Sequence, residues 1–469
     1  MDFKFSSFPI KHWAEFRSSE VAVNWKKGTD LLFSDIPQQI TWKKLSQMIS
    51  QAVTLLQQNG ATPQGIVAYS GHHRLVGLLC YLATITMGSK ILMLNPSMSE
   101  IQRGDILSDF ANVVLITDQH FAQFPANLTA CDSSQYAPNL PATMTLTSGS
   151  TGKPKAVVHS IQNHLENAYG VCQLMDFTAS DSWLLSLPLF HVSGQGIIWR
   201  WLLMGATLSI VEDKRDFWTV LSTVTHASLV TTQLQRYLLQ KEFLPQHIQK
   251  ILLGGSAIPP ELITQAQENQ IETYVGYGMT EMASTICAVK SEIDNVGLPL
   301  WGREVRIVDD EIWVRGAGLA LGYWLKENIV SLVNENGWLV TKDRGHWNEQ
   351  GKLVVDGRTD NVFISGGENI QPEEIERILF QSCLIYQAIV LPTEDTEFGF
   401  RPVAVVDFIS EFSPQAVRSL QSFASERLEK FKLPIKYIPL DREKWKNLGI
   451  KISRKQLQLD INNRYLKNV

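Results

Sequence analysis

The sequence predicts an α/β protein with a large N-terminal body of several subdomains and a smaller α+β C-terminal domain. Short apolar stretches of strand length alternate with helix-length segments through the first part of the chain, a rhythm typical of sheets covered by helices. Past Gly302, strands follow one another more closely, with turn-forming residues between them, which indicates a small antiparallel or barrel-like region. A chain of 469 residues exceeds what one compact core holds, so about two or three domains are expected.

Apolar periodicity predicts the elements of the body. The pattern at 41–58 is helical, and the apolar run at 76–88 is too short to cross a bilayer, which takes about 20 residues, so we expect a buried helix there. The expected strands of the body are 65–69, 91–94, 183–187, 207–211, 227–230, 250–253 and 272–275.

The last part of the chain carries its own pattern. Strands are expected at 305–308, 311–314 and 352–355, then a Gly-Gly turn at 366–367. A helix should begin at 371–374, because Pro372 and the two acidic residues after it suit a first helical turn. We therefore divide the chain near Asp360 into 1–359 and 360–469, the second part having roughly 110 residues, a size that can fold alone.

Composition narrows the class of protein. Apolar residues make up 44% and charged residues 19% of a chain with net charge −5 and pI near 6.1, which argues against a nucleic-acid partner or a basic membrane-surface protein. The five cysteines show no paired spacing, so we expect no disulfide framework and a reducing, cytoplasmic location. The start, residues 1–4, has no signal-peptide pattern, and no membrane span is expected.

A loop rich in glycine and hydroxyl side chains is the most informative motif. Its glycines let backbone N–H groups turn toward an anion, its hydroxyls add donors and its lysine adds charge, so it suits a phosphate; it is not a Walker A loop. On composition alone a flexible loop is the alternative. The candidate nucleotide-binding residues here are Thr147, Ser148, Gly149, Ser150, Thr151, Gly152 and Lys155.

Two further strand ends carry candidate residues. After the strand at 272–275 come Gly276, Tyr277 and Gly278 for the nucleotide, then Thr280 for a phosphate oxygen and Glu281 for Mg²⁺. The alternative is a turn with a solvated glutamate. After 250–253 come Gly254, Gly255 and Ser256, whose small size leaves room for a flat ring or a carboxylate beside the backbone.

Three charged residues complete the candidate set. Asp343 can accept hydrogen bonds from both hydroxyls of a ribose, and Arg358 can donate to the same sugar or to a phosphate. Lys451, flanked by apolar neighbours, could enter a closed site as a fixed cation. Taken singly, Asp343 and Arg358 are more typical of surface ion-pair residues, and Lys451 is more typical of a solvated lysine near a chain end.

In order and spacing, these motifs together resemble the adenylate-forming superfamily of acyl- and aryl-CoA synthetases, adenylation domains and luciferases. The chain departs from the superfamily in having Ile450 between Gly449 and Lys451. The resemblance implies ATP, Mg²⁺ and CoA as reactants: a carboxylate attacks the α-phosphate to give an acyl-adenylate, then a thiol displaces AMP. It further implies a mobile C-terminal domain that rotates about Asp360, bringing Lys451 in for the first step and Gly366 and Gly367 in to line the CoA channel for the second.

Arg200 is the candidate residue for binding the carboxylic acid substrate. It lies among tryptophans and aliphatic residues, and a desolvated guanidinium needs an anionic partner. If this run is helical, Gly196 lies one turn before Arg200 and leaves a gap that a substrate carboxylate can fill. The alternative is an internal pair with Asp or Glu. His191 is either a packed histidine or a polar contact near the acyl pocket, and Ser193 is a further candidate for the substrate.

Segments 144–152, 186–201 and 449–454 are similar to the o-succinylbenzoate-CoA ligase family of menaquinone biosynthesis. That similarity implies a small-molecule dicarboxylic acid as substrate and leaves open which of its carboxylates meets Arg200. The alternatives are another acyl- or aryl-CoA ligase, an enzyme that loads a carrier protein, or a non-catalytic nucleotide-binding protein of the same fold. The sequence leaves open whether the chain forms a homo-oligomer.

Overall fold

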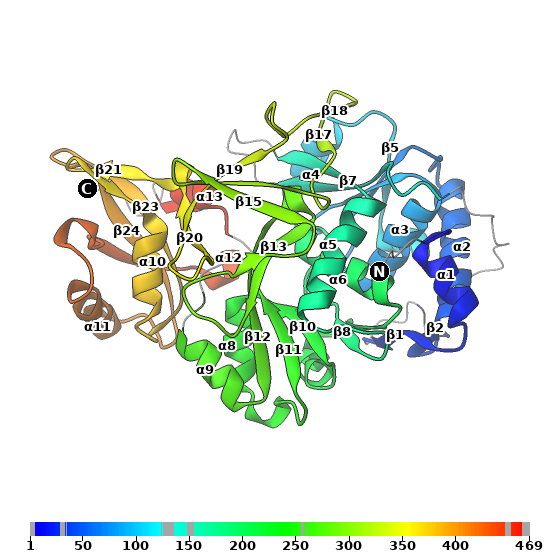
Figure 1. Cartoon of the computed structure of the whole chain (residues 1–469), viewed down its shortest axis with the longest axis horizontal. Coiled ribbons are helices and arrows are strands. Elements are labelled where there is room, and N and C mark those ends of the chain that lie inside the picture. Colours follow the sequence, from blue (N-terminus) through cyan, green and yellow to red (C-terminus); the bar gives the residue numbers. More distant parts are fainter. Residues whose placement is uncertain are drawn as a thin grey trace.

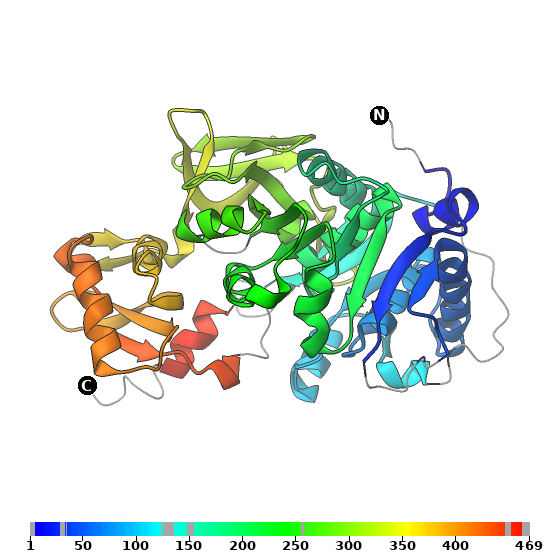
Figure 2. The same ribbon diagram turned by 90° about the horizontal axis from the view of Figure 1, so that it is seen from below.

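The chain folds into a broad body that continues into a smaller C-terminal part along the longest axis of the molecule (Figures 1 and 2). The computed structural model describes residues 5–28, 33, 35–122, 124, 136–147, 154–254, 258, 260–445 and 452–461. Its helices are α1 Pro9–Phe16, α2 Trp42–Gln58, α3 Arg74–Thr86, α4 Glu100–Leu107, α5 Ile161–Leu174, α6 Val192–Met204, α7 Phe217–Leu221, α8 Thr231–Leu239, α9 Pro260–Glu268, α10 Pro372–Phe380, α11 Pro414–Ser425, α12 Arg442–Trp445 and α13 Arg454–Ile461.

The largest sheet of the described residues has nine strands in the order β14-β13-β12-β11-β10-β8-β9-β1-β2. The strands from β12 to β1 along this order run parallel, and antiparallel strands close both edges. Their bounds are β1 Val21–Lys26, β2 Gln39–Thr41, β8 Ser182–Leu184, β9 Thr207–Val211, β10 His226–Leu229, β11 Gln249–Leu253, β12 Ile271–Met279, β13 Ser284–Lys290 and β14 Leu298–Pro299.

A second sheet of the body has seven strands in the order β18-β17-β7-β6-β4-β3-β5. Its hairpin of β6 and β7 flanks the glycine-rich loop, so the sheet carries the predicted phosphate-binding segment at the end of a strand. The bounds are β3 Ile66–Tyr69, β4 Lys90–Met93, β5 Val113–Ile116, β6 Pro141–Thr147, β7 Lys155–Ser160, β17 Gly322–Leu325 and β18 Asn328–Val330.

Helices α3 and α5 lie between these two sheets and contact strands of both, and α6 packs on α5 and on the nine-stranded sheet. Their side chains form one continuous apolar core with the inner faces of the sheets. Helix α6 is buried along most of its length and ends at Gly205, whose φ of 62° is the left-handed conformation that glycine favours at a helix end. Buried helices of this kind place any polar side chain they carry inside the molecule.

The region past Gly302 is a four-stranded antiparallel sheet in the order β15-β16-β19-β20. Of the two predicted alternatives, antiparallel or barrel-like, the described residues form an antiparallel sheet. Its strands are β15 Arg303–Val308, β16 Glu311–Gly316, β19 Leu339–Trp347 and β20 Leu353–Arg358.

The chain leaves this sheet through the short turn Thr359–Asn361 and enters another sheet, which has an apolar core on each face. This sheet joins β22, β21, β24 and β23, with β25 parallel to β24. Its strands are β21 Phe363–Ser365, β22 Glu368–Ile370, β23 Ile385–Asp395, β24 Gly399–Phe408 and β25 Lys436–Pro439.

Most predicted elements lie within a few residues of their expected positions, and two corrections stand out. The strand expected at 183–187 ends at Leu184. The strand expected to stop at Val275 continues to Met279, because Gly276 to Met279 pair with the antiparallel strand β13. The turn after this strand therefore begins at Thr280 rather than at Gly276.

Candidate active site

The base of the glycine-rich loop is fixed by the β6–β7 hairpin. Thr147 and Lys155 are register partners, and the Thr147 hydroxyl donates to the Lys155 carbonyl at 3.4 Å. The Lys155 ammonium lies 5.0 Å from the centre of the Tyr323 ring, a cation–π contact. The predicted phosphate-binding residues between them, Ser148, Gly149, Ser150, Thr151 and Gly152, lie outside the described residues.

Glu281 lies close to the base of this loop. The hydroxyl of Tyr323, the tyrosine that contacts Lys155, donates to Glu281 Oε1 at 2.9 Å. Thr280 and Glu281 form the short turn Thr280–Met282 between β12 and β13. The structure thus brings together the loop base, Lys155, Thr280 and Glu281, which the sequence had proposed for phosphate and Mg²⁺. One carboxylate suits Mg²⁺, which is usually held by one or two carboxylates plus substrate phosphates.

Small residues line the carboxyl ends of β11 and β12. Gly254 and Gly276 are neighbours there: a Cβ placed on Gly254 would lie 3.5 Å from the Gly276 carbonyl oxygen. A Cβ on Gly278 would lie 2.1 Å from the Ser284 carbonyl oxygen, so only glycine fits this crossing of backbones. The predicted Gly255 and Ser256 lie outside the described residues.

Tyr277, Asp343 and Arg358 form one polar cluster. The Tyr277 hydroxyl donates to Asp343 at 2.6 Å, and the Arg358 guanidinium donates to the other oxygen of that carboxylate at 3.1 Å. Burial raises the pKa of Tyr277 well above its usual range, with the Asp343 charge adding to the effect. Arg358 also donates to both carboxylate oxygens of Asp360, at 2.9 and 3.2 Å, which lowers the pKa of Asp360. The predicted ribose residues therefore lie together, beside the predicted hinge.

Arg200 is buried in the middle of α6 and is only 1% exposed. Its guanidinium contacts three hydroxyls, those of Ser228 (3.3 Å), Ser284 (3.5 Å) and Thr285 (3.4 Å). The Trp183 ring centre lies 5.0 Å away. Burial lowers the pKa of Arg200 to about 10, so the group stays cationic at neutral pH. Within the described part of the chain, Arg200 makes no ion pair with an Asp or Glu, contrary to the alternative of an internal pair.

Gly196 lies one helical turn before Arg200, as the helical prediction requires. A Cβ on Gly196 would lie 3.1 Å from an Arg200 Nη atom and 3.2 Å from the Ser284 hydroxyl. The missing side chain therefore lets the Arg200 guanidinium and the Ser284 hydroxyl lie close against the helix backbone. Ser193 is part-buried in the first turn of the same helix.

His191 precedes the first turn of α6. Its Nε2 atom is buried without a hydrogen-bond partner among the described residues, and its ring lies 4.6 Å from the Phe190 ring. Burial lowers the pKa of His191 to about 4, so the imidazole is neutral at pH 7. A neutral histidine can offer a polar contact or pack as a wall, but it adds no cation to the site.

The sequence did not predict the hydroxyl set around Arg200. Ser284 and Thr285 follow the Thr280–Glu281 motif after only Met282 and Ala283, and this short spacing is the one signal that could have indicated them. Ser228 and Trp183 come from β10 and β8, which lie side by side in the sheet. Only the strand order brings those two residues to Arg200.

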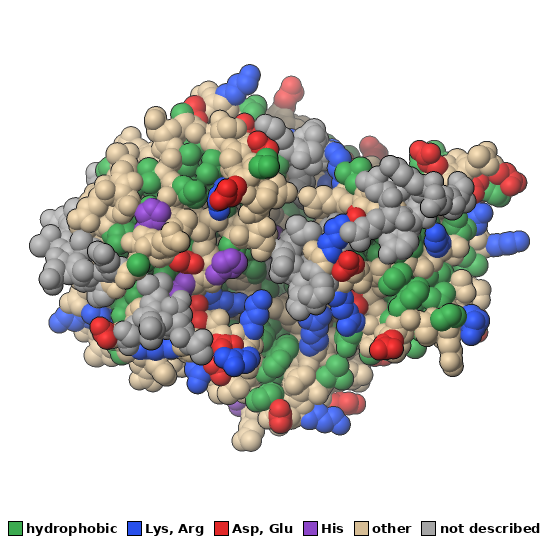
Figure 3. Space-filling view, turned by 180° about the vertical axis from the view of Figure 1, so that it is seen from behind, with side chains coloured by type: hydrophobic (Ala, Val, Ile, Leu, Met, Phe, Trp, Pro, Cys, Tyr) green, Lys and Arg blue, Asp and Glu red, His purple; other side chains and the backbone are tan. Residues whose placement is uncertain are grey.

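The remaining predicted residues lie away from this cluster or outside the described chain. Gly366 and Gly367 form the turn between β21 and β22 with φ of 57° and 91°, conformations that favour glycine. Lys451 lies outside the described residues. Lys and Arg side chains gather around the hollow between the body and the C-terminal part (Figure 3).

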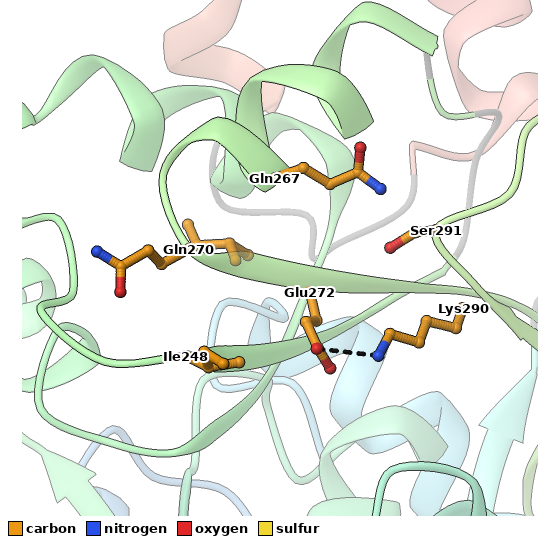
Figure 4. Close-up of a pocket in the computed structure, with 7 residues that line it drawn as sticks. Ile248, Gln267, Gln270, Glu272, Lys290 and Ser291 are labelled. Carbon is orange, nitrogen blue, oxygen red and sulfur yellow. Dashed lines mark ion pairs between the residues drawn. The ribbon is translucent and has the colours of Figure 1, made fainter.

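A separate surface cavity of about 520 Å³ lies at the opposite end of β12 from Thr280 and Glu281. Lys290 and Glu272 form an ion pair of 2.9 Å on its wall (Figure 4). The side chains labelled there are Ile248, Gln267, Gln270, Glu272, Lys290 and Ser291. Since it is remote from the candidate cluster along the strand, we do not assign it to the same site.

Three comparisons agree with this geometry. A family model described as AMP-binding enzyme matches residues 122–324. The chain is 50% identical over 424 residues to 2-succinylbenzoate–CoA ligase from Haemophilus influenzae, an alignment that covers 89% of this chain and 92% of that protein. It is 41% identical over 468 residues to the enzyme of the same name from Escherichia coli, covering 97% and 98% of the two chains.

Solved structures give the same result. A variant of E. coli MenE with bound OSB-AMS superposes with a TM-score of 0.86 at 37% identity, covering 98% of this chain and 99% of that one. Bacillus subtilis o-succinylbenzoate coenzyme A synthetase (MenE), in complex with ATP and magnesium ion, gives a TM-score of 0.80 at 26% identity, with 93% and 96% covered. In the part of the chain that the structure describes, no helix is long and apolar enough to cross a membrane.

Proposed function

This chain belongs to the 2-succinylbenzoate–CoA ligase family of AMP-binding enzymes, and we propose that it joins 2-succinylbenzoate to CoA at the expense of ATP in menaquinone biosynthesis. The acid first becomes an acyl-adenylate with release of pyrophosphate. The CoA thiol then displaces AMP to give the thioester. The single observation that carries the proposal is Arg200, a buried cation that has hydroxyl contacts but no carboxylate partner among the described residues, in a site that otherwise has the parts for ATP.

In the first step, nucleotide and acid approach from two sides of the Thr280–Glu281 turn. The loop at 147–155 would donate to the phosphates, while Asp343 and Arg358 would hold the ribose. Tyr277 supports this assignment, because its hydrogen bond to Asp343 fixes the carboxylate beside the carboxyl end of β12. Gly254, Gly255, Ser256, Gly276 and Gly278 would leave the backbone open to the adenine ring and the acid.

Glu281 would hold the Mg²⁺ ion. Glu281 is part-buried, and its carboxylate accepts a hydrogen bond from Tyr323, the tyrosine that contacts Lys155 at the loop base. When bound, the ion would neutralise charge on the triphosphate. Thr280 would donate its hydroxyl to a phosphate oxygen.

Arg200 would bind the carboxylate that is not activated. The carboxylate that attacks the α-phosphate loses its charge when it becomes the mixed anhydride, so a fixed cation placed on it would oppose the reaction. The benzoate carboxylate keeps its charge throughout, and Arg200 can stabilise it before and after the step. Gly196 and Ser193 would line the binding site for this carboxylate, and the neutral His191 side chain would offer it a polar contact.

The second step would use the C-terminal part as a mobile domain of residues 360–469. Asp360 lies in the turn Thr359–Asn361, through which the chain passes from the four-stranded sheet to the following one, and this supports a hinge there. Lys451 would stabilise the first transition state and then leave, while Gly366 and Gly367 would come in to line the path of CoA. All reactants are small molecules, and we assign the reaction to the cytoplasm.

Replacement of Arg200 tests this function. Arg200→Ala should raise KM for 2-succinylbenzoate about 10- to 100-fold, the usual effect of losing a charge-assisted hydrogen bond in a dry site, and leave KM for ATP within about twofold. Pyrophosphate release measured at varied acid and varied ATP gives both constants. Equal increases in the two KM values would mean that Arg200 supports the fold rather than the acid.

A further inference from the structure

The turn after Glu281 contains two non-glycine residues with left-handed backbone. Ala283 has φ of 55° and Ser284 has φ of 134°. L residues rarely adopt these values, and such conformations persist only where the surroundings hold them. Both residues are buried, with exposed fractions of 1% and 9%. Some contact must therefore hold this turn in place.

The same turn joins the two halves of the candidate site. Thr280 and Glu281, proposed for phosphate and Mg²⁺, come before it and are separated from it by Met282. Ser284 in the turn and Thr285 after it accept hydrogen bonds from Arg200 through their hydroxyls, at 3.5 and 3.4 Å. Any relaxation at Ala283 and Ser284 would move one half of the site relative to the other.

Asn167 on α5 bridges the turn. Its side chain is 1% exposed, and its Nδ2 donates to the Met282 carbonyl at 2.7 Å and to the Thr285 carbonyl at 2.9 Å. The two acceptors stand on either side of Ala283 and Ser284. Because carbonyls only accept, only the amide nitrogen can serve both, which fixes the orientation of the side chain.

Asn167 is itself held in place. The buried Arg303 donates from Nη2 to the Asn167 backbone carbonyl at 2.6 Å and from Nη1 to the Trp301 carbonyl at 2.7 Å. A Cβ on Gly170, one turn along α5, would lie 2.2 Å from Arg303 Nη1, so the helix is shaped to admit this guanidinium. The Arg303 hydrogen bonds therefore help to fix the position of Asn167 on α5.

We propose that Asn167 is a positioning residue that sets the distance between the nucleotide half and the acid half of the site by bridging the left-handed turn. It touches neither reactant and acts through the Met282 and Thr285 carbonyls. The inference rests on the proposed function, since it assigns Thr280 and Glu281 to the nucleotide and Arg200 to the acid.

Three variants test the role of Asn167. Asn167→Leu keeps a similar volume but removes both donors, and should lower kcat/KM for 2-succinylbenzoate about 10- to 100-fold, raising KM for the acid and lowering kcat. Adding Ala283→Gly should recover about threefold or more of the loss, because glycine adopts the left-handed turn without strain. Asn163→Leu is the matched control on the same helix: it removes an amide bond from Asn163 Nδ2 to the Ala317 carbonyl at 2.9 Å, together with the bonds that Asn163 Oδ1 accepts from Ser160 at the helix start. This control should leave both KM values unchanged.

The readout separates positioning from folding. Loss of folded protein lowers apparent kcat in proportion and leaves KM unchanged, so an unchanged KM in Asn167→Leu, or no recovery with Ala283→Gly, would overturn the inference. If Asn167→Leu does not fold, Asn167→Ala, which also lacks the donors, is measured with the same expectations. Native protein that releases no pyrophosphate with 2-succinylbenzoate would overturn the proposed function instead.

Discussion

At the scale of single residues, the evidence for an acid-binding site is that Arg200 is buried without a carboxylate partner among the described residues. A buried guanidinium normally pairs with a carboxylate, because desolvation of an unpaired charge is costly. In the described residues Arg200 has only hydroxyls and an aromatic ring. The sequence could predict that Arg200 is buried in a helix, since its neighbours are apolar, but it could not choose between a substrate and an internal carboxylate. That choice depended on which strands lie beside α6.

The Gly196→Ala substitution tests the space beside Arg200. Alanine favours a helix over glycine by about 1 kcal/mol, so helix α6 itself should tolerate the change. The added Cβ would crowd Arg200 and the Ser284 hydroxyl at 3.1 and 3.2 Å. We expect KM for 2-succinylbenzoate to rise about tenfold or more while thermal stability stays near native. A fall in stability with unchanged KM would show that the glycine serves packing alone.

At the scale of elements, the sequence predicts the positions of strands better than it predicts where the turns between them begin. Periodicity and composition give β11 and the start of β12, but they cannot show that β12 continues through Gly276 to Met279, because the pairing partner β13 lies later in the chain. The left-handed turn at Ala283 and Ser284 had no signal either, since neither residue type favours that conformation. Asn167, distant in sequence, bridges it with two hydrogen bonds that no local pattern indicates.

Strand β7 and helix α5 carry buried histidines that make stability depend on pH. Burial lowers the pKa of His159 to about 3 and that of His164 well below its usual range. As pH falls below about 6.5 the unfolded chain binds protons that the folded chain does not, so stability is complete above that pH and decreases toward pH 4, by up to about 1.4 kcal/mol per pH unit for each histidine.

The His159→Phe variant should flatten the dependence of unfolding free energy on pH between about 6.5 and 4, because it removes one of these groups. Urea unfolding at several pH values measures the slope, with His72→Gln, a change at an exposed histidine, as the control. An identical slope in native and His159→Phe protein would contradict the assignment of buried, neutral His159.

At the scale of the whole molecule, the body and the C-terminal part are built on different sheets that meet at Asp360. The sequence predicts a domain boundary near Asp360 through the change in strand spacing and the following Gly-Gly turn, and this boundary stays a prediction. It could not indicate how the two parts face each other, because that depends on contacts between surfaces distant in sequence. The roles of Asp360, Gly366, Gly367 and Lys451 remain proposals about movement.

The Lys451→Ala variant tests the division of labour between the two steps. If Lys451 stabilises charge on the α-phosphate, its loss should reduce adenylate formation about 100-fold or more. Thioester formation from supplied acyl-adenylate and CoA should stay within about threefold of native, since that step needs no cation at the phosphate. Two separate assays, pyrophosphate release and CoA consumption, measure the steps. Equal loss in both would contradict the assigned role.

The central claim is that this protein adenylates a dicarboxylic aromatic acid, and pyrophosphate release with Mg-ATP across a panel of acids tests it most directly. The panel contains 2-succinylbenzoate, benzoate and medium-chain fatty acids. We predict that kcat/KM for 2-succinylbenzoate exceeds every other value by about 1,000-fold or more, because a monocarboxylate leaves Arg200 buried without a partner. Similar rates with benzoate or a fatty acid, or no pyrophosphate with any of them, would contradict the claim.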